Sequence, residues 1–150
     1  RKGPNFFLIN SISIMLLNYF DKVKDYLLEM GHDIVKEDAA EGILVVTNQS
    51  RGLMNTILDC EGEILIIEQH IMDLNPDNSK AHKRLLQLNR NLVHGAFVLT
   101  EDACMLLFRD TLQLSNLDLN ELEGSLNALS VGLIENTDEL LSWASDKTLA

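Results

Sequence analysis

Hydrophobic and polar positions alternate along the chain in a way that separates helical from strand-like segments. From Leu16 onward, hydrophobic residues recur at three- and four-residue steps and predict one amphipathic helix, which Gly31 ends. Its hydrophobic positions are Phe20, Val23, Leu27 and Met30. Short runs rich in β-branched residues then predict an antiparallel meander. We expect its strands at 33–37, 43–47, 53–60 and 64–67, joined by turns at 38–42, 49–52 and 61–63.

The second half of the chain has a helix, two strands and a further helix in its pattern. Residues 75–77 break the last strand of the meander, and Ser79 is the expected N-cap of a helix. The hydrophobic face of that helix consists of Ala81, Leu85, Leu88 and Leu92. Strands are expected at 96–99 and 104–108. Asp118 and Glu121 then have the spacing of a capping box, which predicts a long third helix that continues through Leu133.

This order of elements predicts an α+β domain. Grouped strands with helices between them favour an antiparallel sheet whose helices pack on one face, in the order α-β-β-β(-β)-α-β-β-α. No repeat or linker divides the chain, so residues 15–150 are expected to form a single domain. Residues 1–14 are interpreted as an extension outside the core, with Met15 as the natural start.

Composition narrows the classes of partner. The net charge of −11 argues against nucleic acid and against anionic membrane surfaces, because both require an excess of Lys and Arg. Cys60 and Cys104 each lie in an apolar strand pattern, which favours buried thiols over a disulfide and a cytoplasmic, reducing compartment. The region from 85 to 129 has the clearest pattern in the chain, and that pattern indicates packing rather than chemistry.

One segment imitates a calcium-binding loop. Asp73, Asn75 and Asp77 match its first three ligand positions. The loop also needs a glycine at its sixth position and a bidentate glutamate at its twelfth, but Asn78 and Arg84 occupy these places. The segment is therefore interpreted as a turn followed by a helix cap.

Other chemically capable residues are scattered. Cys60, His70, His94 and Cys104 are zinc-ligand types, but they lack the paired spacing of structural zinc sites. The sequence has no nucleophile elbow, phosphate-binding loop or dinucleotide fingerprint. We therefore predict a protein that is not an enzyme, with no catalytic, metal or cofactor-binding residue and no cofactor. A small hydrolase or metal-binding protein is the remote alternative, which clustering of these four side chains in a pocket would support.

One charged segment departs from the acidic character of the chain. No acidic residue lies between Asn78 and Thr100, while the predicted second helix carries Lys80, Lys83, Arg84 and Arg90. The favoured interpretation is a solvated face that pairs with acids on neighbouring elements or on a symmetry mate. The alternative is that these four residues contact an acidic partner.

A family resemblance rests on several landmarks. The landmarks are Leu88-Asn89, Gly95-Ala96-Phe97 and Leu107-Phe108-Arg109, followed by leucines at 112, 117 and 122. Together with the order of the elements, they resemble YbjN-type and type III secretion chaperone-like proteins, including Tir chaperones of the CesT type. The resemblance covers roughly residues 18 to 144. The tract from 109 to 124 is similar to stand-alone bacterial members found outside secretion gene clusters.

The resemblance implies a small acidic homodimer that binds an extended segment of a partner protein without ATP. It would use apolar patches and sheet edges, and no binding residue of the family can be transferred to a position of this chain. The identity of the client does not follow from the resemblance. A YbjN-like regulatory or stress-response adaptor is the alternative function.

Overall fold

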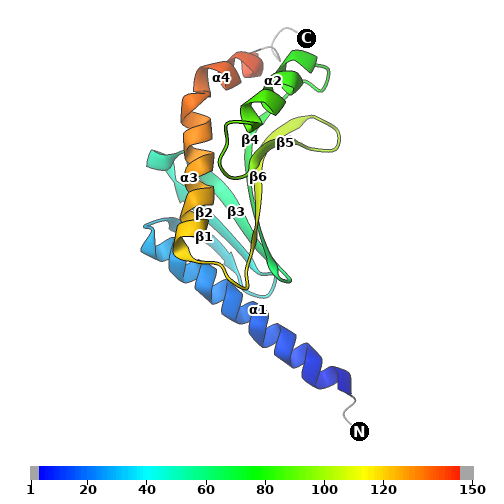
Figure 1. The fold of residues 1–150 in the computed structure, drawn as a ribbon, viewed down its shortest axis with the longest axis vertical. Coiled ribbons are helices and arrows are strands. Elements are labelled where there is room, and N and C mark those ends of the chain that lie inside the picture. Colours follow the sequence, from blue (N-terminus) through cyan, green and yellow to red (C-terminus); the bar gives the residue numbers. More distant parts are fainter. Residues whose placement is uncertain (1–3, 146–150) are drawn as a thin grey trace.

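A computed structural model describes residues 4–145, in which four α-helices pack on a six-stranded sheet (Figure 1). The helices are α1 (Pro4–Glu29), α2 (Ser79–Asn89), α3 (Leu119–Glu135) and α4 (Thr137–Ser145). The strands are β1 (Asp33–Asp38), β2 (Ile43–Asn48), β3 (Leu53–Glu61), β4 (Ile64–Asp73), β5 (Ala96–Leu99) and β6 (Met105–Gln113). Their spatial order is β1-β2-β3-β4-β6-β5, and neighbouring strands are antiparallel. The predicted α+β class is confirmed.

One face of the sheet supplies the buried side chains, because residues alternate between the two faces of a strand. Two clusters lie on this face. The large core, which joins α1 and α3 to the sheet, consists of Phe20, Val23, Leu27, Leu44, Val46, Leu53, Leu58, Cys60, Leu65, Ile67, Phe108, Leu112, Leu114, Leu117, Leu122, Leu126 and Leu129. The small core, which joins α2 and α4 to β5 and β6, consists of Leu74, Ala81, Leu85, Leu88, Phe97, Leu106 and Leu140. The helices therefore cover one face, as predicted.

Several element boundaries differ from the expected ones. The first helix begins at Pro4 rather than near Leu16, and Figure 1 shows its N-terminal part extending away from the sheet. A domain start at residue 15 stays a prediction. Strand β4 is longer than expected because β6 supports it as far as Asp73. The predicted third helix corresponds to α3, and a further helix, α4, follows Asn136, whose side chain donates to the carbonyl of Gly132.

The N-cap of α2 is Asn78 rather than Ser79. The Asn78 side-chain oxygen accepts from the Ala81 N–H at 3.1 Å, so Ser79 becomes the first helical residue. At α3 the predicted cap is confirmed, because the Asp118 carboxylate accepts from the Glu121 N–H at 2.8 Å.

A side-chain clamp holds β5 against α2. Asn89 Oδ1 accepts from the Phe97 N–H at 2.7 Å, and Asn89 Nδ2 donates to the Phe97 carbonyl at 3.0 Å. The preceding turn passes over the Phe108 ring at Gly95, where φ is +67° and a Cβ atom would overlap the ring. Two landmarks of the resemblance thus fix the position of the loop between α2 and β5.

Candidate functional site

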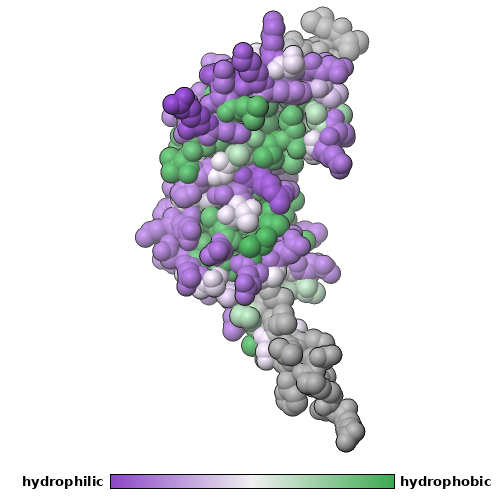
Figure 2. Space-filling model, turned by 45° about the vertical axis from the view of Figure 1, so that its right-hand side comes forward, coloured by the Kyte–Doolittle hydropathy of each residue, from purple (hydrophilic) through white to green (hydrophobic). Residues whose placement is uncertain are grey.

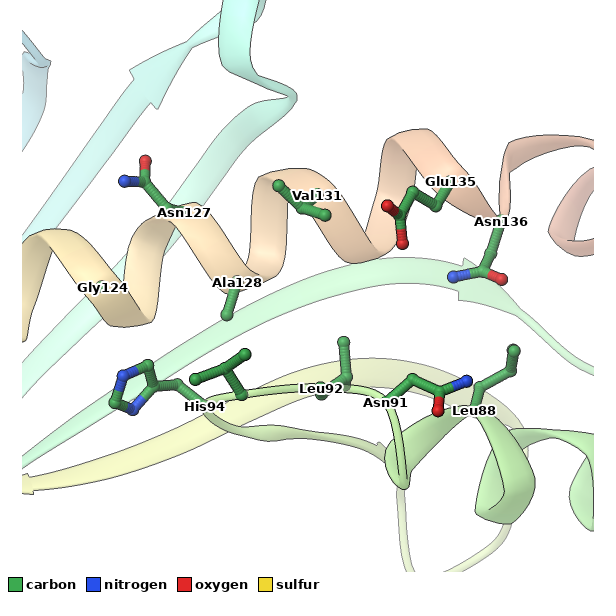
Figure 3. A pocket seen from close by; sticks show the side chains of 11 residues that line it. Leu88, Asn91, Leu92, His94, Gly124, Asn127, Ala128, Val131, Glu135 and Asn136 are labelled. Atoms are coloured by element: carbon green, nitrogen blue, oxygen red, sulfur yellow. The ribbon is translucent and has the colours of Figure 1, made fainter.

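A cleft of about 350 Å³, here the α2–α3 cleft, separates α3 from the end of α2 and the loop that follows it (Figure 3). Its lining combines apolar side chains with amide, imidazole and carboxylate groups. The lining residues are Leu88, Asn91, Leu92, Val93, His94, Gly124, Asn127, Ala128, Val131, Glu135 and Asn136. Figure 3 shows Ala128 pointing from α3 toward the loop that carries Leu92 and His94.

Small residues on α3 let the loop approach closely. Gly124, Ala128 and Gly132 recur at four-residue steps and therefore share one side of the helix. A Cβ at Gly124 would lie 3.1 Å from His94 Nε2, and one at Gly132 would lie 3.1 Å from Leu92 Cδ2. Larger side chains here would push the loop away and change the shape of the cleft.

A second hollow of about 300 Å³, here the β4–α4 pocket, lies on the other side of α3. Two strands and two helices enclose it, and its lining is mainly hydrophobic. The lining residues are Gly52, Met54, Gln69, His70, Ile71, Met72, Leu133, Thr137, Leu140, Leu141 and Ala144. The two hollows therefore flank the C-terminal half of α3.

The sheet divides beside this pocket, and we call the division the β3–β4 fork. The β3–β4 ladder ends at the pair Ile57 and Glu68, whereas β4 continues to Asp73 beside β6. Both strands are irregular here: Asn55 has φ of +50°, and the register with β6 shifts around Ile71. The β3 end of the fork consists of residues 52–56 and the β4 end of residues 69–73.

Gln69 bridges the fork with its side chain. Its Oε1 accepts from the Met54 N–H at 3.1 Å and from the Thr56 hydroxyl at 2.5 Å. Its Nε2 donates to the Gly52 carbonyl at 3.1 Å. Because Gln69 is buried, its amide needs hydrogen-bond partners, and it finds them in the Thr56 hydroxyl and in backbone groups at the start of β3 and just before it.

Exposed hydrophobic side chains border both hollows. Val93 is 86% exposed, Val131 49%, Ile134 64% and Leu141 61%. Figure 2 shows hydrophobic patches on one face of the molecule with hydrophilic side chains around them. Such patches typically mark interaction sites, so this surface is the candidate functional site.

The four predicted contact residues lie on or at the end of α2. Arg84 Nε lies 2.7 Å from Glu139 Oε1 on α4, as the solvated-face interpretation expects for a pair between neighbouring elements. Lys80, Lys83 and Arg90 are exposed and form no ion pair with another residue in 4–145. Their contact with an acidic partner stays a prediction.

The structure does not bring the four candidate zinc-ligand residues together. Cys60 is buried in β3, where burial raises the pKa of its thiol to about 11 and disfavours a thiolate. His70 Nε2 lies 3.4 Å from Asp73 Oδ1 on β4. His94 lines the α2–α3 cleft, and Cys104 is a free thiol before β6. Within residues 4–145, no three His, Cys, Asp or Glu side chains are grouped to hold a metal ion.

The segment that imitates a calcium loop forms a turn. The Asp77 N–H donates to Asn75 Oδ1 at 2.9 Å, and the Ser79 N–H donates to the Asp77 carbonyl at 2.9 Å. These bonds close the turn that leads into α2, as the helix-cap interpretation expects.

Sequence reasoning missed both hollows. A glycine-alanine-glycine series at 124, 128 and 132 was the available signal for the α2–α3 cleft, because it indicates close approach to α3. The fork had no comparable local signal, since it depends on Gln69 reaching residues far away in the sequence.

None of the helices in the described part of the chain combines the length and hydrophobicity needed to span a membrane.

The architecture is that of a small α+β protein whose antiparallel sheet is covered by helices on one face and bordered by two hollows. The chain belongs to the CesT_Tir_1 family, whose model matches residues 16–146. The predicted resemblance is confirmed. No curated protein matches the sequence.

Solved structures share the fold at low sequence identity. YbjN of E. coli, a suggested transcription regulator, is 12% identical with a TM-score of 0.57, over 80% of this chain and 92% of YbjN. A chain of the HopA1-SchA chaperone-effector complex is 17% identical with a TM-score of 0.56, over 88% and 97%. The Yersinia pestis type III secretion chaperone SycH, solved with a fragment of YscM2, is 13% identical with a TM-score of 0.50. The match covers 83% of this chain and 98% of the SycH chain. At these identities the likeness establishes the fold.

Proposed function

We propose that this protein is a non-catalytic chaperone that holds an extended segment of a client protein over the two hollows flanking α3. The observation that carries the proposal is the largely apolar lining of both hollows, which includes the exposed side chains of Val93, Val131 and Leu141. Exposure of hydrophobic side chains to water has a cost that a bound apolar segment would remove. Membership of a chaperone family supports the same function.

Binding rather than catalysis also agrees with the chemistry of the surface. The Cys60 thiol is buried with a raised pKa, and His94 is the imidazole in the α2–α3 cleft. Amide groups at Asn91 and Asn127 can instead hydrogen-bond the backbone of a client segment. We infer reversible capture that requires no cofactor and no nucleotide.

The direct test places a photocrosslinking amino acid at Val131 in the source cell. A matched control places it at Leu28 on α1, since these helix positions are 49% and 53% exposed. We expect Val131 to give crosslinks to a small set of client proteins that are absent at Leu28. The purified client segment should then bind the protein, and Val131→Glu should weaken binding while Leu28→Glu leaves it unchanged. Identical crosslinks at both positions would refute the proposal.

We propose further that the protein acts in the cytoplasm as a homodimer. Both cysteines are free, which agrees with a reducing compartment. The open sheet face with Ile57 and Ile64 offers hydrophobic area for a two-fold contact that leaves Val131 accessible to a client. Light scattering at micromolar concentration should give twice the monomer mass of 16.9 kDa, and a monomer would contradict this state.

A regulatory or stress-response adaptor is the second candidate, which the likeness to YbjN favours. An adaptor would bind a folded partner, whereas a chaperone binds an unfolded segment. Proteolysis of the complex distinguishes them, because a short protected client peptide supports the chaperone and protection of a whole folded domain supports the adaptor. A gene for the client beside the gene for this protein would also favour the chaperone.

A further inference from the structure

We propose that the α2–α3 cleft binds a small organic amine, with a positively charged nitrogen at its Glu135 end and a hydrophobic body along its middle. The occupant is a small molecule rather than a protein segment, so the site itself does not depend on the proposed chaperone function. Val131 lines the cleft and also lies on the proposed client surface, so a bound amine would compete with the client. That regulation, unlike the ligand site, rests on the proposed function.

The cleft has two polar ends and an apolar middle. Figure 3 shows His94 beside Gly124 at one end and Glu135 with Asn136 at the other. At about 1.5 Å per helical residue, the part of α3 between Gly124 and Glu135 is roughly 16 Å long. The apolar residues between these ends are Leu92, Ala128 and Val131. This shape suits an elongated molecule with one polar end.

The Glu135 carboxylate has no cation beside it in the protein. Glu135 lines the cleft and forms no ion pair with another side chain in residues 4–145. Arg90 caps the end of α2, but it is exposed and is not part of the cleft lining. A hydrogen bond between an ammonium group and a carboxylate is stronger than one between neutral partners. Glu135 therefore favours a protonated amine over an alcohol or an acid.

Two helix ends strengthen the preference for positive charge. Helix α2 ends at Asn89 and α3 at Glu135, so the last turns of both helices lie at this end of the cleft. The backbone carbonyls at a helix C-terminus carry partial negative charge and favour a nearby cation. Asn136 donates from Nδ2 to the Gly132 carbonyl, which leaves its Oδ1 to accept from an ammonium group. The carboxylate, the amide oxygen and the helix carbonyls thus favour the same charge.

The remainder of the cleft limits the size and polarity of the ligand. Its volume of about 350 Å³ is at the lower end for small-molecule sites, which suits a body of one or two rings. His94 closes the far end, because its Nε2 lies 3.1 Å from the position that a Cβ at Gly124 would take. The apolar middle disfavours a second charge. These features define a monoamine with an aromatic or aliphatic body.

The test compares three probes that share an indole body. Tryptamine carries an amine, tryptophol an alcohol and indole-3-propionate a carboxylate. Titration of the purified protein, followed by NMR, gives the three dissociation constants. We expect tryptamine to bind at least about threefold more tightly than tryptophol, and indole-3-propionate to bind most weakly. Equal binding of the three probes, or no binding of tryptamine, would overturn the proposal.

Two matched variants separate the cleft from general attraction to a protein with a net charge of −11. Glu135→Gln removes the charge and keeps the shape of the side chain. Glu121→Gln removes the same charge from an exposed position at the other end of α3, outside the cleft lining. We expect the preference for tryptamine over tryptophol to be lost in Glu135→Gln and kept in Glu121→Gln. Equal loss in both variants would assign the preference to net charge and overturn the site.

The position of the hydrophobic body is tested at Ala128, whose side chain points from α3 across the cleft in Figure 3. Ala128→Leu should abolish binding of all three probes, and the NMR spectrum of the variant shows whether it is folded. In the unmodified protein, tryptamine should shift the amide resonances of residues 91–94 and 124–136. Shifts confined to other residues would overturn the proposal whether or not the variant folds.

The ligand site and the chaperone function can fail separately. Crosslinks to clients at Val131, with no preference of the protein for tryptamine, would reject the ligand site alone. Tryptamine binding in the cleft, with identical crosslinks at Val131 and Leu28, would support the ligand site and reject the chaperone function. If both hold, excess tryptamine should weaken binding of the purified client segment.

Discussion

The large core and the small core differ in how completely they are closed. The large core packs α1 and the first half of α3 against a continuous part of the sheet. The small core holds α2, β5 and α4 at the end where the sheet divides, and both hollows open beside it. Ile71 and Leu133 pack against both clusters. We infer that stability resides mainly in the large core, which allows the other end to keep hydrophobic surface exposed.

Removing a large side chain from the large core should have the largest effect. Phe108 is fully buried, so Phe108→Ala is expected to lower the free energy of unfolding by about 3–5 kcal/mol through lost burial and the cavity that remains. Urea denaturation followed by circular dichroism measures the change. Phe108→Leu is the control and should recover much of the loss. An effect below 1 kcal/mol, on the order of a surface substitution, would contradict the assigned role of the large core.

The small core should depend more on polar contacts. In Asn89→Ala the Phe97 N–H and carbonyl lose both side-chain partners, which is expected to cost about 1–3 kcal/mol. Asn91→Ala is the control, because Asn91 is exposed and lies in the following loop. Hydrogen exchange should accelerate in β5 before it does in β2. Equal acceleration in both strands would show that the two cores unfold as one unit.

The sequence predicted the elements of both cores better than the boundary between them. Periodicity found Phe20, Val23 and Leu27 on one helix because a buried helical face follows a local repeat. The break between α3 and α4 has no glycine or proline, but Asn136 is a local signal for it, because asparagine favours helix ends. The fork had no such signal, because Gln69 lies beyond the predicted strand at 64–67 and its amide binds residues at the start of β3.

A pH dependence should arise at the edge of the large core. Burial, then the positive charge of Arg51, lowers the pKa of His32 below 6.5, while Asp33 and Glu123 oppose the shift. At pH values between the folded-state pKa of His32 and 6.5, the unfolded chain binds more protons than the folded protein does. The stabilising contribution of neutral His32 is therefore present above about pH 6.5 and is lost as pH falls through the folded pKa, with a slope of at most about 1.4 kcal/mol per pH unit.

His32→Asn provides the matched variant for that measurement. The Asn48 amide lies 3.2 Å from His32 Nδ1, and an asparagine oxygen can accept in its place without titrating near neutral pH. The free energy of unfolding is measured at intervals from about pH 7.5 to about pH 5, the range in which histidine titrates. It should fall less steeply with falling pH in His32→Asn than in the unmodified protein. Identical slopes would assign the pH dependence to other groups.

The smallest effect is expected at the ion pair that joins α2 to α4 beside the small core. Arg84 and Glu139 are partly exposed, so their interaction should contribute at most about 1 kcal/mol and weaken with salt. A double-mutant cycle with Arg84→Ala and Glu139→Ala isolates this coupling. If Arg84 instead serves an acidic client, Arg84→Ala will weaken client binding while Glu139→Ala, which frees the arginine, strengthens it. Equal loss of binding in both variants would show that the pair acts by holding α4 in position beside the pocket.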